Sequence, residues 1–319
     1  MKPRVFVTRQ IPEAGMQIIQ AAADADVWPD ELPPPYDVLA DRTAPCDGLL
    51  CLLTDRIDAG LLDRAPNLRV VSQLAVGYDN VDVAACTARG IKVGNTPGVL
   101  TETTADLAFA LLMATARRIV ESDRIVRAGK WLTWSPLFMA GADVHHATLG
   151  IVGMGRIGYE VARRASGFQM TILYADARPN EAAERDFGAH RVSLDDLLQA
   201  SDFVTIHTPL LPETTHLIGE RELKLMKPSA MLINTARGPI VDQKALYEAL
   251  VTGAIAAAGL DVFEVEPVPG NEPLLALDNV VVLPHIGSAS VATRTRMAVI
   301  AAENLVAGLR GEPLPCPVN

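Results

Sequence analysis

Cysteine is scarce in this sequence, and its few cysteines do not pair in any recognisable spacing. Cys46, Cys51, Cys86 and Cys316 are scattered, and no two of them form a Cys-x-x-Cys unit. This distribution argues against a structural zinc site and against a disulfide framework. It suits a reducing compartment, so we expect a cytoplasmic protein that carries no metal.

Positive charge and long apolar runs are also in short supply. Lys and Arg number 28 against 38 Asp and Glu, which gives a formal charge of −10. An acidic surface repels phosphate backbones, so nucleic acid is not expected as a partner. The most apolar long stretch, Ala105–Ala116, is too short to span a bilayer, and residues 1–19 lack the pattern of a signal peptide. No membrane association is therefore expected.

What the chain does have is enough apolar sequence for two domains. It is 319 residues long, with 49% hydrophobic and 21% charged residues. Short β-branched segments alternate with helix-length segments, a pattern typical of α/β folds with parallel sheets. The first series of strands is expected at Val5–Arg9, Gly48–Leu53, Arg69–Leu74 and Ile91–Asn95, and a second series of six begins at Thr148.

Two helical segments bear on how these domains are arranged. Thr101–Ile119 is predicted to be one helix that is apolar on nearly all sides, so it must be buried between domains or at a subunit contact. We therefore expect a homodimer built largely on this helix and on the aromatic loop that follows it. Ala289–Leu309 is predicted to return to the first domain. The expected domains are residues 1–99 with 289–319, and residues 100–288.

The strongest local motif is a glycine-rich turn in the segment 149–164. Gly153, Gly155 and Gly158 form G-x-G-x-x-G directly after an apolar strand and before a helix. This turn lets a backbone approach a pyrophosphate, and the N-terminus of the following helix favours the negative charge. We predict a dinucleotide site here that also uses the other residues of the turn, which are Met154, Arg156 and Ile157. The alternative is a tight turn without a ligand.

The residue that ends the next strand indicates which dinucleotide is bound. Asp176 lies close to the interval at which an acidic residue accepts hydrogen bonds from the ribose of NAD. A carboxylate there repels a 2′-phosphate, so NAD is favoured. Arg178 follows two positions later and leaves NADP open, because an arginine can accommodate that phosphate; it can equally be a solvated loop residue.

Four charged or titratable residues follow the later β-branched strands. Arg237, Asp261, Glu266 and His285 should lie near the carboxyl ends of these strands, where open α/β sheets bind ligands. Individually, Arg237 and Glu266 can be solvated and His285 can be a core residue. Together they match the reduction of a 2-keto acid, which needs a cation for the carboxylate, a proton donor for the ketone and a group that tunes the donor.

With these residues and motifs the chain resembles the D-2-hydroxyacid dehydrogenase family, and within it the glyoxylate/hydroxypyruvate reductases. The resemblance runs over essentially the whole length and includes VGYDNVD, NTPGVLTETTADLAFALLMATARR, GIVGMGRIG, MKPSAMLINTARGPIVD, GLDVFEVEP and NEPLLALDNVVVLPHIGSA. It implies a Rossmann-like dinucleotide-binding domain inserted in a flavodoxin-like substrate domain. It also implies the NAD(P)-dependent reduction of a small 2-keto acid to the D-2-hydroxy acid.

The resemblance assigns further roles. Arg237, Glu266 and His285 match the catalytic residues of the family, and His285 is the proton donor. Asp261 matches the residue that holds the nicotinamide carboxamide, and Val76 and Gly77 match the loop whose N–H groups meet the substrate carboxylate. Positions matching cofactor contacts are Thr104, Thr208, Thr235 and Gly287.

Other polar and aromatic residues admit more than one interpretation. His145 and His146 are expected to be solvated, and His207, inside a strand, is expected to be a hydrogen-bonded structural residue. Trp131, Trp134 and Phe138 belong either to an extension that reaches a partner subunit, as the resemblance implies, or to the core. Two alternative functions stay open, a dinucleotide-sensing corepressor-like protein and a dehydrogenase of a bulkier D-2-hydroxy acid.

Overall fold

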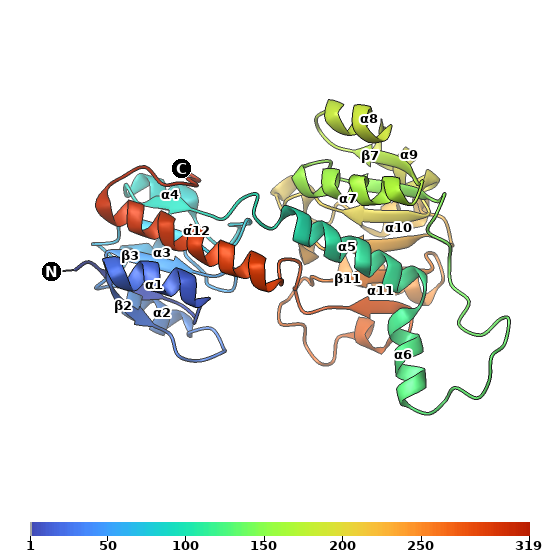
Figure 1. Cartoon of the computed structure of the whole chain (residues 1–319), viewed down its shortest axis with the longest axis horizontal. Helices are drawn as coiled ribbons and strands as arrows, with labels where there is room; N and C mark the ends of the chain where they lie inside the picture. Colours follow the sequence, from blue (N-terminus) through green and yellow to red (C-terminus); the bar gives the residue numbers. More distant parts are fainter. Residues whose placement is uncertain (1) are drawn as a thin grey trace. The chain divides into compact units, whose positions relative to one another are not determined.

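The computed structural model describes residues 2–319 and divides them into two compact units (Figure 1). Of the described residues, the first unit combines 2–100 with 288–319, and the second comprises 101–287. Within the described residues, no helix is both long enough and apolar enough to cross a membrane.

The first unit is built on a five-stranded parallel sheet. Its strand order is β2-β1-β3-β4-β5, the flavodoxin-like order. The strands are β1 (Arg4–Val7), β2 (Asp24–Val27), β3 (Gly48–Cys51), β4 (Val70–Gln73) and β5 (Lys92–Gly94). The edge strand β2 was not predicted, because its sequence DADV alternates polar and apolar residues without a β-branched run.

Helices cover both faces of this sheet. They are α1 (Glu13–Ala22), α2 (Tyr36–Thr43), α3 (Ala59–Asp63), α4 (Val83–Ala88) and α12 (Val291–Arg310). Because successive residues of a strand face opposite ways, Val5 and Val7 pack with α1 and α12, whereas Phe6 packs with α2, α3 and α4. The C-terminal helix α12 thus supplies a large part of the core on one face (Figure 1).

The second unit contains a seven-stranded parallel sheet. Its order, β12-β11-β10-β9-β6-β7-β8, is the Rossmann order with one additional strand at the far edge. The strands are β6 (Thr148–Val152), β7 (Thr171–Ala175), β8 (His190–Arg191), β9 (Phe203–Ile206), β10 (Met231–Asn234), β11 (Ala257–Leu260) and β12 (Val280–Val282). Sequence patterns did not predict β8, which has only two residues.

The helices of this unit also form two layers. One face of the sheet packs against α5 (Thr101–Ala116), α7 (Arg156–Gly167) and α8 (Glu181–Phe187). The other packs against α9 (Leu194–Ala200), α10 (Glu220–Leu225) and α11 (Gln243–Val251). The helix α6 (Ile119–Arg127) and three short 3₁₀ helices complete the unit, η1 (Pro212–Thr214), η2 (Gly238–Ile240) and η3 (Pro273–Ala276).

Two expectations about the segment 101–119 are wrong. It is not one helix, because α5 ends at Ala116 and Arg118 adopts a left-handed conformation (φ 50°) before α6 begins. Nor does its apolar surface require a subunit contact. Ala105, Phe109 and Leu112 are buried inside the second unit, where α5 packs against α7, β10 and β11. A helix covered by both a sheet and another helix can be apolar all round.

We predict that Gly15→Ala weakens the first unit by disrupting the contact between α1 and α12. A Cβ atom at Gly15 would lie 2.7 Å from the carbonyl oxygen of Ala298, so one helix must shift. The free energy of unfolding should fall by about 1–3 kcal/mol. Hydrogen exchange of peptides from each unit, measured as a function of urea concentration, should show that the loss of stability lies in the first unit.

Gly167→Ala is the matched control, since Gly167 also lies in a helix but a Cβ there would meet nothing within 4 Å. It should leave stability unchanged or raise it by up to about 1 kcal/mol. Equal unfolding midpoints for the two variants would show that α1 and α12 are not closely packed.

Candidate active site

The glycine turn between β6 and α7 has the geometry of a phosphate-binding loop. Gly153 has φ 95°, and a Cβ there would lie 2.7 Å from the Thr208 nitrogen. A Cβ on Gly158 would lie 2.2 Å from the Gly153 oxygen, so the helix packs tightly on the turn. Gly155, by contrast, is the N-cap residue of α7, provides no side-chain cap, and a Cβ there would meet nothing within 4 Å. The N–H groups at this helix end are therefore available to an anion.

Asp176 comes directly after β7, and its carboxylate is tied to the same turn. Oδ2 accepts a hydrogen bond from the Met154 N–H at 2.8 Å, and Oδ1 accepts one from the Arg178 N–H at 3.1 Å. The Arg178 side chain is exposed. This arrangement fixes a negative charge beside the turn, where the sequence predicted the ribose of the cofactor.

Two residues that sequence reasoning missed complete this region. The side-chain amide of Asn180 donates to the Met154 carbonyl at 2.8 Å, and the Arg191 guanidinium donates to the Asp176 carbonyl at 2.9 Å. Arg191 lies on β8, where it pairs in register with Tyr174 of β7. No local signal identifies either residue, because both reach the turn only through the pairing and packing of later elements.

Buried polar atoms without partners lie at the ends of β10 and β11. Thr235 Oγ1 and Asp261 Oδ2 form no hydrogen bond of normal geometry among the described residues. Burial raises the pKa of Asp261, although the N–H groups of Ile286 and Gly287 oppose the shift. Unsatisfied buried oxygens are costly, and a bound group can satisfy them. Asp261 can accept from an amide such as that of nicotinamide.

Thr104 and Gly287 lie beside this carboxylate. A Cβ built on Gly287 would lie 3.3 Å from Asp261 Oδ2 and 3.4 Å from the Thr104 Cγ2. Thr104 is buried in the first turn of α5. The structure thus brings together three residues that are far apart in the sequence, at the carboxyl edge of the larger sheet.

Glu266 and His285 form a direct pair. The His285 Nδ1 lies 2.6 Å from Glu266 Oε2, and each side chain is 25% exposed. Glu266 Oε1 accepts from the Phe263 N–H at 3.0 Å, which fixes the carboxylate. Burial alone would raise the pKa of Glu266, but the hydrogen bond and charge of His285 outweigh it and leave that pKa below its ordinary value. The carboxylate is therefore an anion at neutral pH, and Nε2 of His285 is the ring nitrogen left to act on a ligand.

Arg237 lies near this pair in the segment between β10 and η2. Its charge contributes to lowering the pKa of Glu266, and its carbonyl accepts from the Asn234 side-chain amide at 2.9 Å. The guanidinium donates to the Ala236 carbonyl at 2.8 Å. The second unit therefore places an arginine, a carboxylate and a histidine at the same sheet edge as the glycine turn.

Val76 and Gly77 belong to the first unit and follow its strand β4. The Val76 carbonyl accepts from the Asn95 side-chain amide at 2.8 Å. Within the described part of the chain, neither the Val76 nor the Gly77 N–H donates a hydrogen bond. These N–H groups are available to a ligand.

The side chains of His145, His146 and His207 do not join the Glu266–His285 pair. His145 and His146 are exposed in a loop, as expected. His207 forms a 2.8 Å hydrogen bond with Thr205, and burial lowers the pKa of His207 to about 3. It is therefore neutral at physiological pH, in line with a structural role. Among residues 2–319, no group of three or more His, Cys, Asp or Glu side chains is arranged to hold a metal ion.

The aromatic loop is not part of the core, so that interpretation is wrong. Trp131, Trp134 and Phe138 are exposed, as are Leu132 and Leu137 between them. Trp134 is 77% exposed and Leu137 86%.

The residues of the second unit fit a dinucleotide. Gly155 leaves open space at the N-terminus of α7, where a pyrophosphate would lie. Asp176 would face the ribose, and the unpaired oxygens of Thr235 and Asp261 would meet polar groups of the nicotinamide end.

Comparison with known proteins places the chain in a family. Residues 109–287 match the model described as "D-isomer specific 2-hydroxyacid dehydrogenase, NAD binding domain". The glyoxylate reductase of Korarchaeum cryptofilum (strain OPF8) is 59% identical over 320 residues, which cover 100% of this chain and 96% of that protein.

Solved structures agree over the full length. A crystal structure of a Thermus thermophilus protein has a TM-score of 0.93 and 46% identity, covering 99% of this chain and 100% of the other. The NADPH-dependent glyoxylate/hydroxypyruvate reductase of Sinorhizobium meliloti, in complex with NADP and malonate, has a TM-score of 0.87 and 33% identity, covering 100% and 97%. By its family match and its full-length relatives, the chain belongs to the D-isomer specific 2-hydroxyacid dehydrogenases.

Proposed function

We propose that this protein is an NAD(P)-dependent reductase of small 2-keto acids, with glyoxylate as its first substrate and hydroxypyruvate as its second. The observation that carries the proposal is the 2.6 Å contact between His285 Nδ1 and Glu266 Oε2, at the same sheet edge as the dinucleotide turn. The Korarchaeum relative, a glyoxylate reductase, supports the choice of substrate.

The residues around the pair divide the work of the reaction. Reduction adds a hydride to the carbonyl carbon and a proton to the carbonyl oxygen. The cofactor, when bound, supplies the hydride. His285 supplies the proton from Nε2, because Nδ1 faces Glu266, and it becomes neutral in the same step. Glu266 orients the ring through its contact with Nδ1.

The substrate is held through its carboxylate and its ketone. In this proposal the N–H groups of Val76 and Gly77 bind the carboxylate, and Arg237 presents a planar cation to the substrate. A short 2-keto acid offers both groups within a few atoms of each other. A correctly held ketone accounts for much of the rate, since misplacement by about 1 Å can cost on the order of 100-fold.

The cofactor is held by the residues of the second unit that sequence analysis identified. The turn of Gly153, Gly155 and Gly158 takes the pyrophosphate, together with Met154, Arg156 and Ile157. Asp261 takes the carboxamide, and the cleft is completed by Thr104, Thr208, Thr235 and Gly287. We propose NAD as the preferred form, because the Asp176 carboxylate lies at the turn through its bond to the Met154 N–H.

The protein is further proposed to be a cytoplasmic homodimer. The loop 131–138 supports a dimer, because Trp134 and Leu137 expose large apolar side chains close together in sequence. In the proposed dimer, a second copy of the chain covers the exposed apolar side chains of this loop.

The first test is kinetic. Steady-state rates with glyoxylate, hydroxypyruvate and bulkier 2-keto acids, each with NADH and NADPH, should give the highest kcat/KM for glyoxylate with NADH. Arg237→Lys should lower that kcat/KM by roughly 100-fold while leaving the KM for the cofactor nearly unchanged, because lysine cannot form the planar fork.

Arg221→Lys is the control for that variant, since Arg221 pairs with Asp195 at the surface of the same unit. It should retain full activity. An equal loss of cofactor binding in Arg237→Lys would contradict the role of Arg237.

A second prediction concerns the Glu266–His285 pair. Glu266 is ionised at neutral pH because its pKa is lowered, and its carboxylate holds His285 through Nδ1. In Glu266→Gln this carboxylate is absent, so the ring is no longer held for proton transfer. The kcat of keto acid reduction should fall by on the order of 100-fold, while the KM for the cofactor should change little. Glu264→Gln is the control, because Glu264 pairs with His216 instead; an equal kcat in the two variants would remove Glu266 from the mechanism.

A third prediction concerns cofactor choice. Asp176→Ser removes the negative charge that would face a 2′-phosphate, so the ratio of kcat/KM for NADPH to that for NADH should rise by on the order of 10-fold. Arg178→Ala in the same background should reverse part of that gain if its guanidinium meets the phosphate. A wild-type preference for NADPH would show that Asp176 does not contact the ribose.

A fourth prediction concerns assembly. Light scattering at low micromolar concentration should give the mass of two chains. The double variant Trp134→Ser, Leu137→Ser should shift it toward one chain, whereas Leu32→Ser, which replaces an exposed leucine elsewhere, should not. A wild-type mass of one chain would rule out the dimer.

A further inference from the structure

In the turn that follows β4, three consecutive carbonyl groups each accept a hydrogen bond. The Ala75 carbonyl accepts from the Thr96 N–H at 2.9 Å, and the Val76 carbonyl accepts from Asn95 Nδ2 at 2.8 Å. The Gly77 carbonyl accepts from Gln73 Nε2 at 3.4 Å. Three consecutive peptide groups are thus held by their oxygens.

Fixing these oxygens also fixes the N–H groups. The peptide bonds here are trans, so each N–H points away from the carbonyl of its own peptide group. Anchoring the carbonyls of residues 75, 76 and 77 therefore aims the N–H groups of Val76, Gly77 and Tyr78. Within the described residues, none of these three N–H groups donates a hydrogen bond. Successive free N–H groups form a concave site for an anion.

Gln73 donates to the Gly77 carbonyl from the end of β4. Its side-chain amide is oriented by hydrogen bonds to two other residues. It is fully buried at the end of β4. Its Oε1 accepts from the Cys51 thiol at 3.1 Å, and its Nε2 donates to Asn80 Oδ1 at 2.8 Å. Burial raises the pKa of Cys51 well above its ordinary value, so the thiol keeps its proton and acts as donor. The amide can then present only Nε2 to Gly77.

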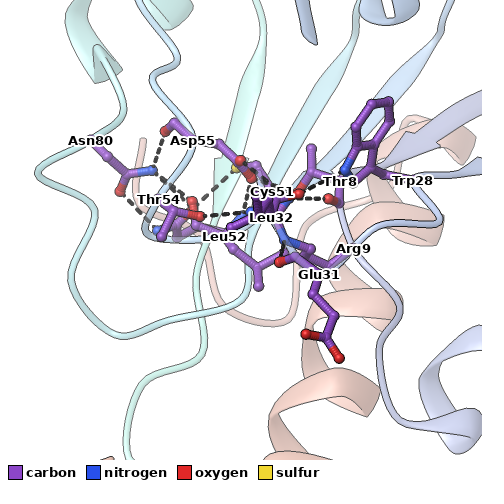
Figure 2. Close-up of polar contacts among 11 residues, drawn as sticks. Thr8, Arg9, Trp28, Glu31, Leu32, Cys51, Leu52, Thr54, Asp55 and Asn80 are labelled. Carbon is purple, nitrogen blue, oxygen red and sulfur yellow. Dashed lines mark hydrogen bonds and ion pairs between the residues drawn. The ribbon is translucent and has the colours of Figure 1, made fainter. Parts of the chain in front are cut away.

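Asn80 holds Gln73 in this orientation. Its Nδ2 donates to the carbonyls of Leu52 and Asp55, at 3.0 and 2.7 Å, which leaves Oδ1 for Gln73. Figure 2 shows Asn80 reaching the Leu52–Asp55 turn. Both hydrogens and the oxygen of this amide are therefore in use.

The Leu52–Asp55 turn is itself rigidly held. The buried Asp55 carboxylate accepts from the Thr8 hydroxyl at 2.5 Å and from the Leu52 N–H at 2.8 Å (Figure 2). Arg9 adds a cation 4.0 Å from the other carboxylate oxygen. The chain of contacts thus runs from the ends of β1 and β3 through Asn80 and Gln73 to Gly77.

We propose that Gln73 and Asn80 are positioning residues that hold the turn 76–78 as a preformed cradle of three N–H groups for the substrate carboxylate. The proposal rests on the function proposed above and adds the Tyr78 N–H to the carboxylate site. Neither side chain touches the substrate. Gln73 acts through the Gly77 carbonyl, and Asn80 acts through Gln73.

The test compares Gln73→Met and Asn80→Ala with the wild-type protein. Because the cradle binds the carboxylate in the ground state and in the transition state alike, each variant should raise the KM for glyoxylate by on the order of 10-fold or more. The kcat and the KM for the cofactor should change little. The double variant should be no worse than the more impaired single variant, because both side chains act on the same carbonyl.

Asp82→Ala is the matched control. Asp82 lies in the same segment as Asn80, but its carboxylate caps α4 through the Ala85 N–H at 2.8 Å. This variant should lose thermal stability without raising the KM for glyoxylate. A similar rise in KM in Asp82→Ala would show that general loosening of the segment, not the amide pair, is responsible. An unchanged KM in folded Gln73→Met and Asn80→Ala would overturn the proposal.

A measurement without turnover separates this proposal from the proposed function. The inhibition or dissociation constant of malonate, a carboxylate without a ketone, should rise in both variants by a factor similar to the KM. If the wild-type protein reduces no keto acid, the proposed function fails, while malonate binding still reports on the cradle. If Gln73→Met does not fold, the partly exposed position of Asn80 carries the test alone.

Discussion

The pair formed by Glu266 and His285 depends on how the ends of β11 and β12 are joined. The His285 N–H donates to the Asp261 carbonyl at 2.9 Å, and the Asp261 carboxylate accepts from the Ile286 N–H at 2.7 Å. His285 adopts a left-handed conformation (φ 55°), which few non-glycine residues take and histidine takes more readily than most. These bonds hold the strained backbone, and the ring consequently meets Glu266. Asp261 thus links the pair to the buried oxygens at the ends of β10 and β11.

Parallel topology explains why so many functional groups meet at one edge. Every strand of each sheet ends on the same side, so residues that follow β6, β7, β10, β11 and β12 converge without being neighbours in sequence. The same rule operates in the first unit, where residues after β1, β3 and β4 build the network around Asp55 and Asn80. Buried polar groups at both edges are satisfied by specific partners or left open for a ligand.

Much of this was predictable from local sequence. The glycine turn, Asp176 and the residues after the later strands follow from motif spacing, because the strand–turn–helix unit imposes that spacing whatever the rest of the fold does. The edge strands β2 and β8 were not predictable, since their pairing comes from neighbours rather than from their own short sequences. The break at Arg118 was also missed, because no proline or glycine marks it. Asn180, Arg191, Gln73 and Asn80 act through contacts 4 to 28 residues away, which spacing alone does not reveal.

The position of α12 in the first unit has a consequence for when that unit can complete its core during synthesis. Val5, Leu50 and Val70 are synthesised before the second unit, yet they pack against Ala298, Ala301 and Leu305, which follow that unit in the sequence. The Arg69 side chain likewise donates to the Leu309 carbonyl, 240 residues away. The second unit has all its residues on hand before that point, whereas the first unit has an uncovered apolar face until α12 leaves the ribosome. The apolar face formed by Val5, Leu50 and Val70 therefore stays open to other chains until the second unit has been synthesised.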